Sequence, residues 1–179
     1  MYPDFKELLS TLNAHKAKYL IVGGFAVGFH SQPRATKDLD ILIRPDAQNA
    51  KAVYDALARF GAPLEGLTPH DLLDPDGFFR MGQAPVMIEI LPFIKGIEFD
   101  DAWQRRVEIV VDRATGLTAF VLSREDLVTA KLAPSTSGSR RCRCDPKGGR
   151  SPTRIGKTRN LAPGSCATGN YLGVPLEGP

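Results

Sequence analysis

Two aspartates, Asp38 and Asp40, lie one residue apart where an apolar run that ends at Ile43 begins. In an extended strand, side chains two residues apart point to the same face of the sheet. The two carboxylates should therefore lie about 6–7 Å apart, and their repulsion costs about 2–3 kcal/mol at an effective dielectric constant near 20. Either the pair lies in open water, or a cation is held between the two carboxylates.

Two further features bear on that choice. Gly23 and Gly24 lie at a predicted strand-to-helix turn, where backbone N–H groups and the helix dipole favour an anion such as a phosphate, although an ordinary tight turn would also explain them. Glu89 is the lone charge in the apolar run VMIEIL, so it either faces solvent on an edge strand or meets a cation. Proteins usually hold Mg²⁺ with two or three carboxylates, and a triphosphate completes the coordination. Together, these residues are typical of such a site.

The elements that must position these residues alternate between helical and strand periodicity. Helices are predicted at 3–14, 25–30, 47–60, around Trp103 and from Ser123, strands at 18–22, 39–43, 107–111 and 117–122, a polar loop at 71–77, and a hairpin of FFRM and VMIEIL across 82–85. Ser123 and Asp126 form a capping-box pattern at the start of the last helix. The alternation predicts an α/β (α+β) fold, with a small mixed β-sheet and flanking helices.

Composition and charge divide the chain near Lys131. The 179 residues suit one domain of ordinary apolar content, and no apolar run approaches the ~20 residues that span a membrane. The N-terminus is an amphipathic helix pattern interrupted by Asp4 and Glu7, not a signal peptide, so we expect a cytoplasmic protein without a membrane partner. The net charge is −3 over residues 1–131 and +6 over residues 132–179.

The segment 132–179 has no sustained periodicity and is dominated by Gly, Pro, Ser and Arg. We therefore expect a folded domain at 1–131 and a disordered tail at 132–179. SPTRIGKT in this tail ends like a phosphate-binding loop, but it lacks the first glycine and a preceding strand. Cys142, Cys144 and Cys166 lack a fourth ligand at zinc spacing, so incidental thiols are expected.

The order of these motifs resembles the nucleotidyltransferase superfamily: G-G, then about a dozen residues, then D-x-D on a strand, and an acidic residue on a later strand. YLIVGGFAVGFHSQPRATKDLDILI and the later GAPLEGL, IEIL and SREDLVTAK resemble, more closely, the small bacterial nucleotidyltransferase-like proteins, including those paired with antitoxins. The resemblance covers about residues 15–131 and includes the R-x-T lead-in of Arg34 and Thr36.

The resemblance implies a minimal nucleotidyltransferase fold and a role for each motif residue. Gly23 and Gly24 would let the backbone approach the β- and γ-phosphates of a nucleoside triphosphate. Asp38 and Asp40 would hold one or two Mg²⁺ (or Mn²⁺) ions. Glu89 would be the third carboxylate, both a metal ligand and the base for the acceptor hydroxyl, where close relatives often have Asp.

Three more residues are assigned to the nucleotide through this resemblance. Arg34 and Thr36 precede the D-x-D motif, and Arg34 would either clamp a phosphate or remain a solvated loop residue. Lys131 matches a lysine that relatives use near the nucleotide. In relatives its helix continues into a basic turn and a further helix, whereas here the tail begins. This departure indicates a frameshifted or otherwise non-homologous C-terminus and puts activity in question.

Three functions remain open on this sequence. The first is a Mg²⁺-dependent transfer of a nucleoside monophosphate to an acceptor hydroxyl or phosphate, as part of a toxin–antitoxin or defence system with an antitoxin partner. The second is a catalytically impaired relative that binds a nucleotide or a partner protein. The third is a nucleic-acid-binding module that uses the basic tail. Neither the nucleotide nor the acceptor (tRNA, protein or small molecule) can be read from the sequence.

Overall fold

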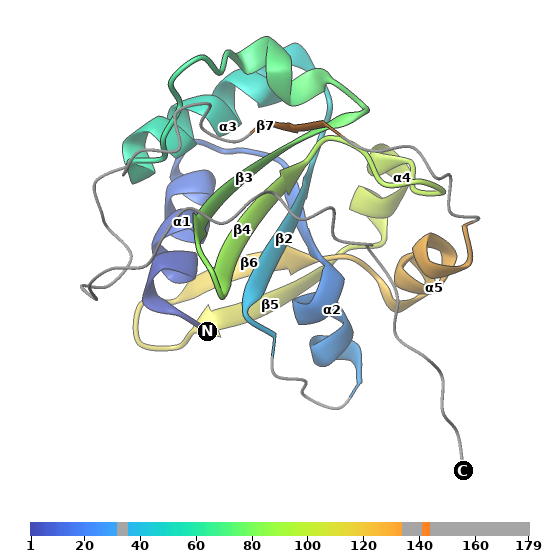
Figure 1. Cartoon of the computed structure of the whole chain (residues 1–179). Coiled ribbons are helices and arrows are strands. Elements are labelled where there is room, and N and C mark those ends of the chain that lie inside the picture. Colours follow the sequence, from blue (N-terminus) through green and yellow to red (C-terminus); the bar gives the residue numbers. More distant parts are fainter. Residues whose placement is uncertain (32–35, 134–140, 144–179) are drawn as a thin grey trace.

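A mixed β-sheet forms the centre of the computed structural model, which describes residues 1–31, 36–133 and 141–143, the last three by their backbone alone (Figure 1). The strand order is β5-β6-β1-β2-β4-β3-β7. The strands are β1 Tyr19–Val22, β2 Asp38–Ile43, β3 Gly77–Gln83, β4 Val86–Leu91, β5 Val107–Asp112, β6 Leu117–Val121 and β7 Arg141–Arg143. The helices are α1 Pro3–Ala14, α2 Gly23–His30, α3 Ala47–Phe60, the 3₁₀ helix η1 Pro69–Leu73, α4 Phe99–Gln104 and α5 Arg124–Leu132. The predicted α+β fold is confirmed.

The pairing of the strands brings the D-x-D strand next to both other motif segments. β2 runs antiparallel to β1 on one side and parallel to β4 on the other. β3 and β4 form the predicted hairpin, and β5 and β6 form a second one beside β1. β2 and β4 are therefore interior strands, and charged side chains on them are close to the core.

One face of the sheet packs against α1 and α3, which lie on the same side in Figure 1. Leu39, Ile41 and Ile43 of β2 point to this face because alternate residues of a strand share a face. In α1, Leu8 and Leu12 recur at helical spacing, and both are completely buried. The helices predicted at 3–14 and 47–60 have the predicted bounds.

The opposite face of the sheet packs against α4 and the start of α5. Leu20, Val22 and Leu42 contribute to this second apolar cluster. Because β2 alternates, Asp38 and Asp40 belong to the same face as Leu42. The strand thus places two carboxylates at the margin of an apolar cluster.

Local signals fix the ends of several helices. The Asp46 carboxylate accepts a hydrogen bond from the Asn49 N–H at 2.9 Å and caps α3, which ends at Gly61 with φ +87°. Ser123 Oγ accepts from the Asp126 N–H at 3.1 Å at the start of α5, as the capping pattern predicted. Within the described part of the chain, no helix has the length and apolar character needed to cross a bilayer.

Two elements differ from the sequence-based expectation. The second helix begins at Gly23, because this glycine adopts helical hydrogen bonding directly after β1. The segment 69–73 is a 3₁₀ helix that overlaps the predicted loop, and Thr68 and Asp71 cap it reciprocally. Most of the predicted tail lies outside the described residues. β7, which falls within that tail, pairs through its backbone with β3.

Candidate active site

The turn from β1 into α2 brings a glycine backbone against the second aspartate. Gly23 has φ +61°, a left-handed conformation that side chains rarely adopt. A Cβ atom at this position would lie only 1.8 Å from Asp40 Oδ2. Two reasons therefore require glycine at position 23: its positive φ angle, and the close approach of the Asp40 carboxylate to the N-terminus of α2.

The second glycine of the turn has a different neighbour. A Cβ atom on Gly24 would lie 2.7 Å from Thr36 Oγ1 and 3.0 Å from Thr36 Cβ. The Thr36 hydroxyl also donates a weak hydrogen bond to the Asp38 carbonyl oxygen at 3.3 Å. Thr36 thus connects the start of α2 to the start of β2, and the G-G and D-x-D motifs form one structural unit.

The sheet register places charged side chains in one lateral row. Asp40 of β2 lies opposite Val22 of β1 and Glu89 of β4, and Glu89 lies opposite Arg80 of β3. Asp40 is only 6% exposed and Glu89 only 3%. Asp38 lies on the same face two residues earlier and is exposed. All three predicted carboxylates therefore share a face, and Asp40 and Glu89 are cross-strand neighbours.

Glu89 accepts hydrogen bonds from an arginine that sequence reasoning missed. Arg80 Nε lies 2.6 Å from Glu89 Oε1, and Arg80 Nη2 contacts the same oxygen. Of the two explanations for a charge in VMIEIL, solvent exposure at a sheet edge does not apply, because β4 lies between β2 and β3. A signal for this pair exists in the sequence: a hairpin turn at Ala84-Pro85 pairs Gln83 with Val86 and hence Arg80 with Glu89.

The carboxylates suit a magnesium ion whose coordination sphere is completed by the phosphates of a bound nucleotide. Carboxylate oxygens are the ligands that Mg²⁺ prefers, and Mg²⁺ commonly takes only one or two of them from the protein, with phosphate and water oxygens as the rest. In the described residues, no three His, Cys, Asp or Glu side chains gather closely enough to form a cage of their own. Asp40, beside the N-terminus of α2, and Asp38, two residues earlier on the same face of β2, fit this two-carboxylate pattern.

The remaining predicted residues differ in where they lie. Arg34 falls outside the described residues. Lys131 lies in the last turn of α5, and its side chain is exposed. Helices α2 and α5 are in contact, but among the residues that the structure covers no hydrogen bond or ion pair joins Lys131 to the carboxylate row.

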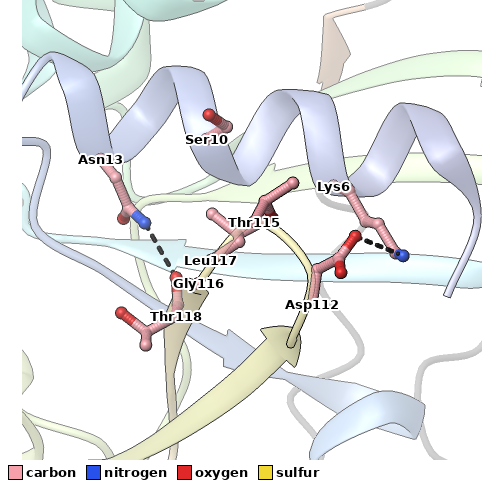
Figure 2. A pocket seen from close by; sticks show the side chains of 8 residues that line it. All are labelled: Lys6, Ser10, Asn13, Asp112, Thr115, Gly116, Leu117 and Thr118. Carbon is pink, nitrogen blue, oxygen red and sulfur yellow. Dashed lines mark hydrogen bonds and ion pairs between the residues drawn. The ribbon is translucent and has the colours of Figure 1, made fainter.

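Two of the hollows on the surface of the described residues bear on where a nucleotide could bind. The larger, of about 380 Å³, lies between α1 and the β5–β6 turn (Figure 2). Lys6 donates to Asp112 at 2.8 Å at one end of it, and Asn13 donates to the Thr118 carbonyl oxygen at the other. None of the predicted site residues lines it. The smaller, of about 310 Å³, borders the glycine turn, and its lining comprises Met1, Tyr2, Pro3, Phe25 and Thr36.

Comparison with known families supports the resemblance seen in the motifs. The family described as "Nucleotidyltransferase of unknown function (DUF6036)" matches residues 3–138. This match includes the glycine turn, the D-x-D strand, Glu89 and all of α5. No curated protein matches the chain. Because the family match extends over well more than half of the sequence, the chain belongs to this family of nucleotidyltransferases of unknown function.

Proposed function

We propose that this protein is a Mg²⁺-dependent nucleotidyltransferase that moves a nucleoside monophosphate from a nucleoside triphosphate to an acceptor hydroxyl or phosphate. One observation carries the proposal: the contact between Gly23, at the N-terminus of α2, and the buried carboxylate of Asp40. The contact brings an anion-binding backbone and a cation-binding carboxylate together, and a metal–triphosphate complex needs both.

The chain's own residues supply binding and orientation. The first N–H groups of α2 and its dipole attract the phosphates, while the lack of side chains at Gly23 and Gly24 allows the backbone to approach them. Asp38 and Asp40 would hold the cation. When bound, Mg²⁺ neutralises charge that develops on the phosphates.

The reaction is an in-line displacement at the α-phosphorus. A bond forms between the acceptor oxygen and the α-phosphorus, the bond from the α-phosphorus to the bridging oxygen breaks, and pyrophosphate leaves. The proton of an acceptor hydroxyl passes to the Glu89 carboxylate, which lies beside Asp40 in the row. The acceptor is a tRNA, protein or small molecule, and a toxin–antitoxin system with an antitoxin partner fits this family resemblance.

Thermal unfolding with Mg²⁺ and a non-hydrolysable triphosphate tests the binding site. At 100 times Kd, such a ligand stabilises the folded chain by about 2.7 kcal/mol, which raises Tm. Asp40→Asn should abolish this rise. Asp76→Asn, at an exposed aspartate outside the row, is the matched control and should keep the full rise. An undiminished rise in Asp40→Asn would contradict the proposed site.

The ion pair at Glu89 favours a second candidate function, in which the protein binds a nucleotide but does not catalyse its transfer. An arginine already occupies the carboxylate that would accept the proton. Incubation with each labelled nucleoside triphosphate and with tRNA, protein or small-molecule acceptors separates the two. The transferase yields a labelled acceptor that depends on Asp40. The binding protein shows the Asp40-dependent rise in Tm and no labelled product with any acceptor.

A further inference from the structure

We propose that Arg80 is a positioning residue that keeps Glu89 out of the metal coordination sphere, so that the chain binds one divalent cation through Asp38 and Asp40. This inference rests on the proposed function. It assigns a role to a residue that neither the family match nor the motifs single out. It also separates the two roles that the resemblance gives to Glu89, by retaining proton acceptance and removing metal ligation.

The geometry of the ion pair supports a fixed arrangement. Two N–H groups of the guanidinium, Nε at 2.6 Å and Nη2, contact the same oxygen of Glu89. Hydrogen bonds between two charged groups are stronger than neutral ones, and the planar guanidinium restricts the direction of its donors. The Arg80 guanidinium also lies over the Phe78 ring, 5.4 Å from the ring centroid. Arg80 is thus held on two sides, by a carboxylate and by an aromatic ring.

The lateral row explains why this arrangement opposes a metal at Glu89. Asp40, Glu89 and Arg80 face one another in register across β2, β4 and β3. A cation that bridged Asp40 and Glu89 would lie beside the guanidinium, and the two positive charges would repel each other at low dielectric. A cation that bridged Asp38 and Asp40 would lie farther from Arg80 along the strand. The guanidinium therefore favours the aspartate pair as the cation site.

A titration of Mn²⁺ against the full chain, followed by the electron paramagnetic resonance signal of free Mn²⁺, tests this assignment. With a non-hydrolysable triphosphate present, the native chain should bind one Mn²⁺, and Asp40→Asn should lose it. Arg80→Met keeps much of the side-chain volume and removes the charge. It should bind Mn²⁺ at least about tenfold more tightly, or bind a second ion, because the positive charge that opposes a cation beside Glu89 is removed.

The double variant Arg80→Met/Glu89→Gln shows whether Glu89 coordinates the metal ion or only contributes a negative charge near it. Its net charge equals that of the native chain, so a loss of affinity would report a lost ligand. Mn²⁺ affinity within about threefold of the native value is expected, since Asp38 and Asp40 remain. Arg80→Lys, which keeps the positive charge, should also stay within that range. The balanced double variant remains informative even if Arg80→Met alone does not fold.

Each result has one meaning. If the native chain binds Mn²⁺ through Asp40 and the double variant binds it at least tenfold more weakly, Glu89 is a metal ligand. This result would leave the proposed function in place and overturn the proposed role of Arg80. An unchanged affinity and stoichiometry in folded Arg80→Met would overturn it as well. A native chain that binds no Mn²⁺ through Asp40 would overturn the proposed function together with this inference.

Discussion

Asp126 and Glu89 are buried carboxylates that each accept hydrogen bonds from an arginine, yet their surroundings differ. Asp126 uses both of its oxygens: Arg105 Nη2 lies 2.7 Å from Oδ1, Arg105 Nε lies 3.1 Å from Oδ2, and the Ser123 hydroxyl donates to Oδ2 at 2.8 Å. At Glu89, both Arg80 donors contact one oxygen, and a second buried carboxylate, Asp40, lies alongside.

The difference separates a structural ion pair from the proposed binding site. Around Asp126, one buried carboxylate meets one guanidinium at the start of α5, where its negative charge also suits the helix dipole. The exposed carboxylates of Asp101 and Glu125 also act on Arg105. In the lateral row, two buried carboxylates lie beside one guanidinium, with Asp38 near them. Burial of carboxylates is common to both places. Among the described residues, only the row has two buried carboxylates side by side, and such an arrangement is typical of sites that bind a cation.

Gly23→Ala should have the largest effect on the row. The added Cβ would meet Asp40 Oδ2 at 1.8 Å, so the carboxylate must move away from α2. The rise in Tm with Mg²⁺ and triphosphate should vanish, and turnover with it. Gly116→Ala is the control, because Gly116 has a similar φ of +68° and no atom within 4 Å of the added Cβ. The control should lose about 1–2 kcal/mol of stability from backbone strain and keep the full ligand response. An equal ligand response in both variants would disprove the role of the Gly23–Asp40 contact.

Glu89→Gln should reduce turnover by roughly 10²–10⁴-fold, since the amide keeps the shape of the side chain and cannot accept the acceptor's proton. Triphosphate affinity should largely remain, so the loss should appear in kcat more than in KM. Steady-state kinetics with a labelled triphosphate measures both. A variant with near-native kcat would mean that Glu89 takes no part in the chemistry and that the row matters for binding alone.

Asp126→Asn should affect stability and leave the site intact. The amide loses the charge that Arg105 and Ser123 surround, at a cost of about 1–3 kcal/mol. The cost stays below that of a fully buried pair because the Arg105 side chain is 52% exposed and keeps access to water. Urea unfolding should show this loss, whereas the ligand-dependent rise in Tm should equal that of the native chain. A lost ligand response here would contradict the separation of the two regions.

The same pair predicts a dependence of stability on pH. Burial alone would raise the pKa of Asp126. Hydrogen bonds from Arg105 and Ser123, together with the charge of Arg105, outweigh this effect, so the folded-state pKa lies below 3.8. A lowered folded-state pKa means that the stabilisation is present above the unfolded pKa and is lost as the pH falls through the folded value. The stability difference between native and Asp126→Asn chains should be constant from pH 7 to about pH 5 and shrink below about pH 4. A difference that shrinks between pH 7 and pH 5 would rule out Asp126 as the titrating group.

Much of the fold could be predicted because its signals are local. The helices at 3–14 and 47–60 follow from apolar residues at helical spacing, and β2 and β4 follow from short apolar runs. The start of α2 differs from the prediction, because a Gly-Gly pair on its own predicts a turn, whereas the helix begins at Gly23. The 3₁₀ helix at 69–73 was missed for a similar reason, since its polar residues are also those of a loop.

The site could be predicted only as far as strand alternation extends. Asp38, Asp40 and Glu89 share a face, as the period of two requires. Arg80 does not follow from the sequence in the same way, because a predicted hairpin loop of four residues at 82–85 does not define the register of the two strands. A shift of one residue in register sends a side chain to the other face of the sheet. In the structure the turn is Ala84-Pro85, and the resulting register pairs Arg80 with Glu89.

The smallest effect is expected at the larger hollow, which offers an alternative place for a nucleotide (Figure 2). Lys6 and Asp112 form an ion pair there at 2.8 Å, and the Lys6 ammonium holds the pKa of Asp112 below its usual range. This balanced pair lacks the features of a triphosphate site, because the negative charge of Asp112 would repel phosphates. Lys6→Met should therefore leave the affinity for Mg²⁺–triphosphate within about twofold of the native value, as expected for a partly buried ion pair away from the site. Isothermal titration of the full chain measures this affinity, with Asp40→Asn run in parallel. A large loss of affinity in Lys6→Met, together with native affinity in Asp40→Asn, would move the nucleotide from the carboxylate row to the hollow between α1 and the β5–β6 turn.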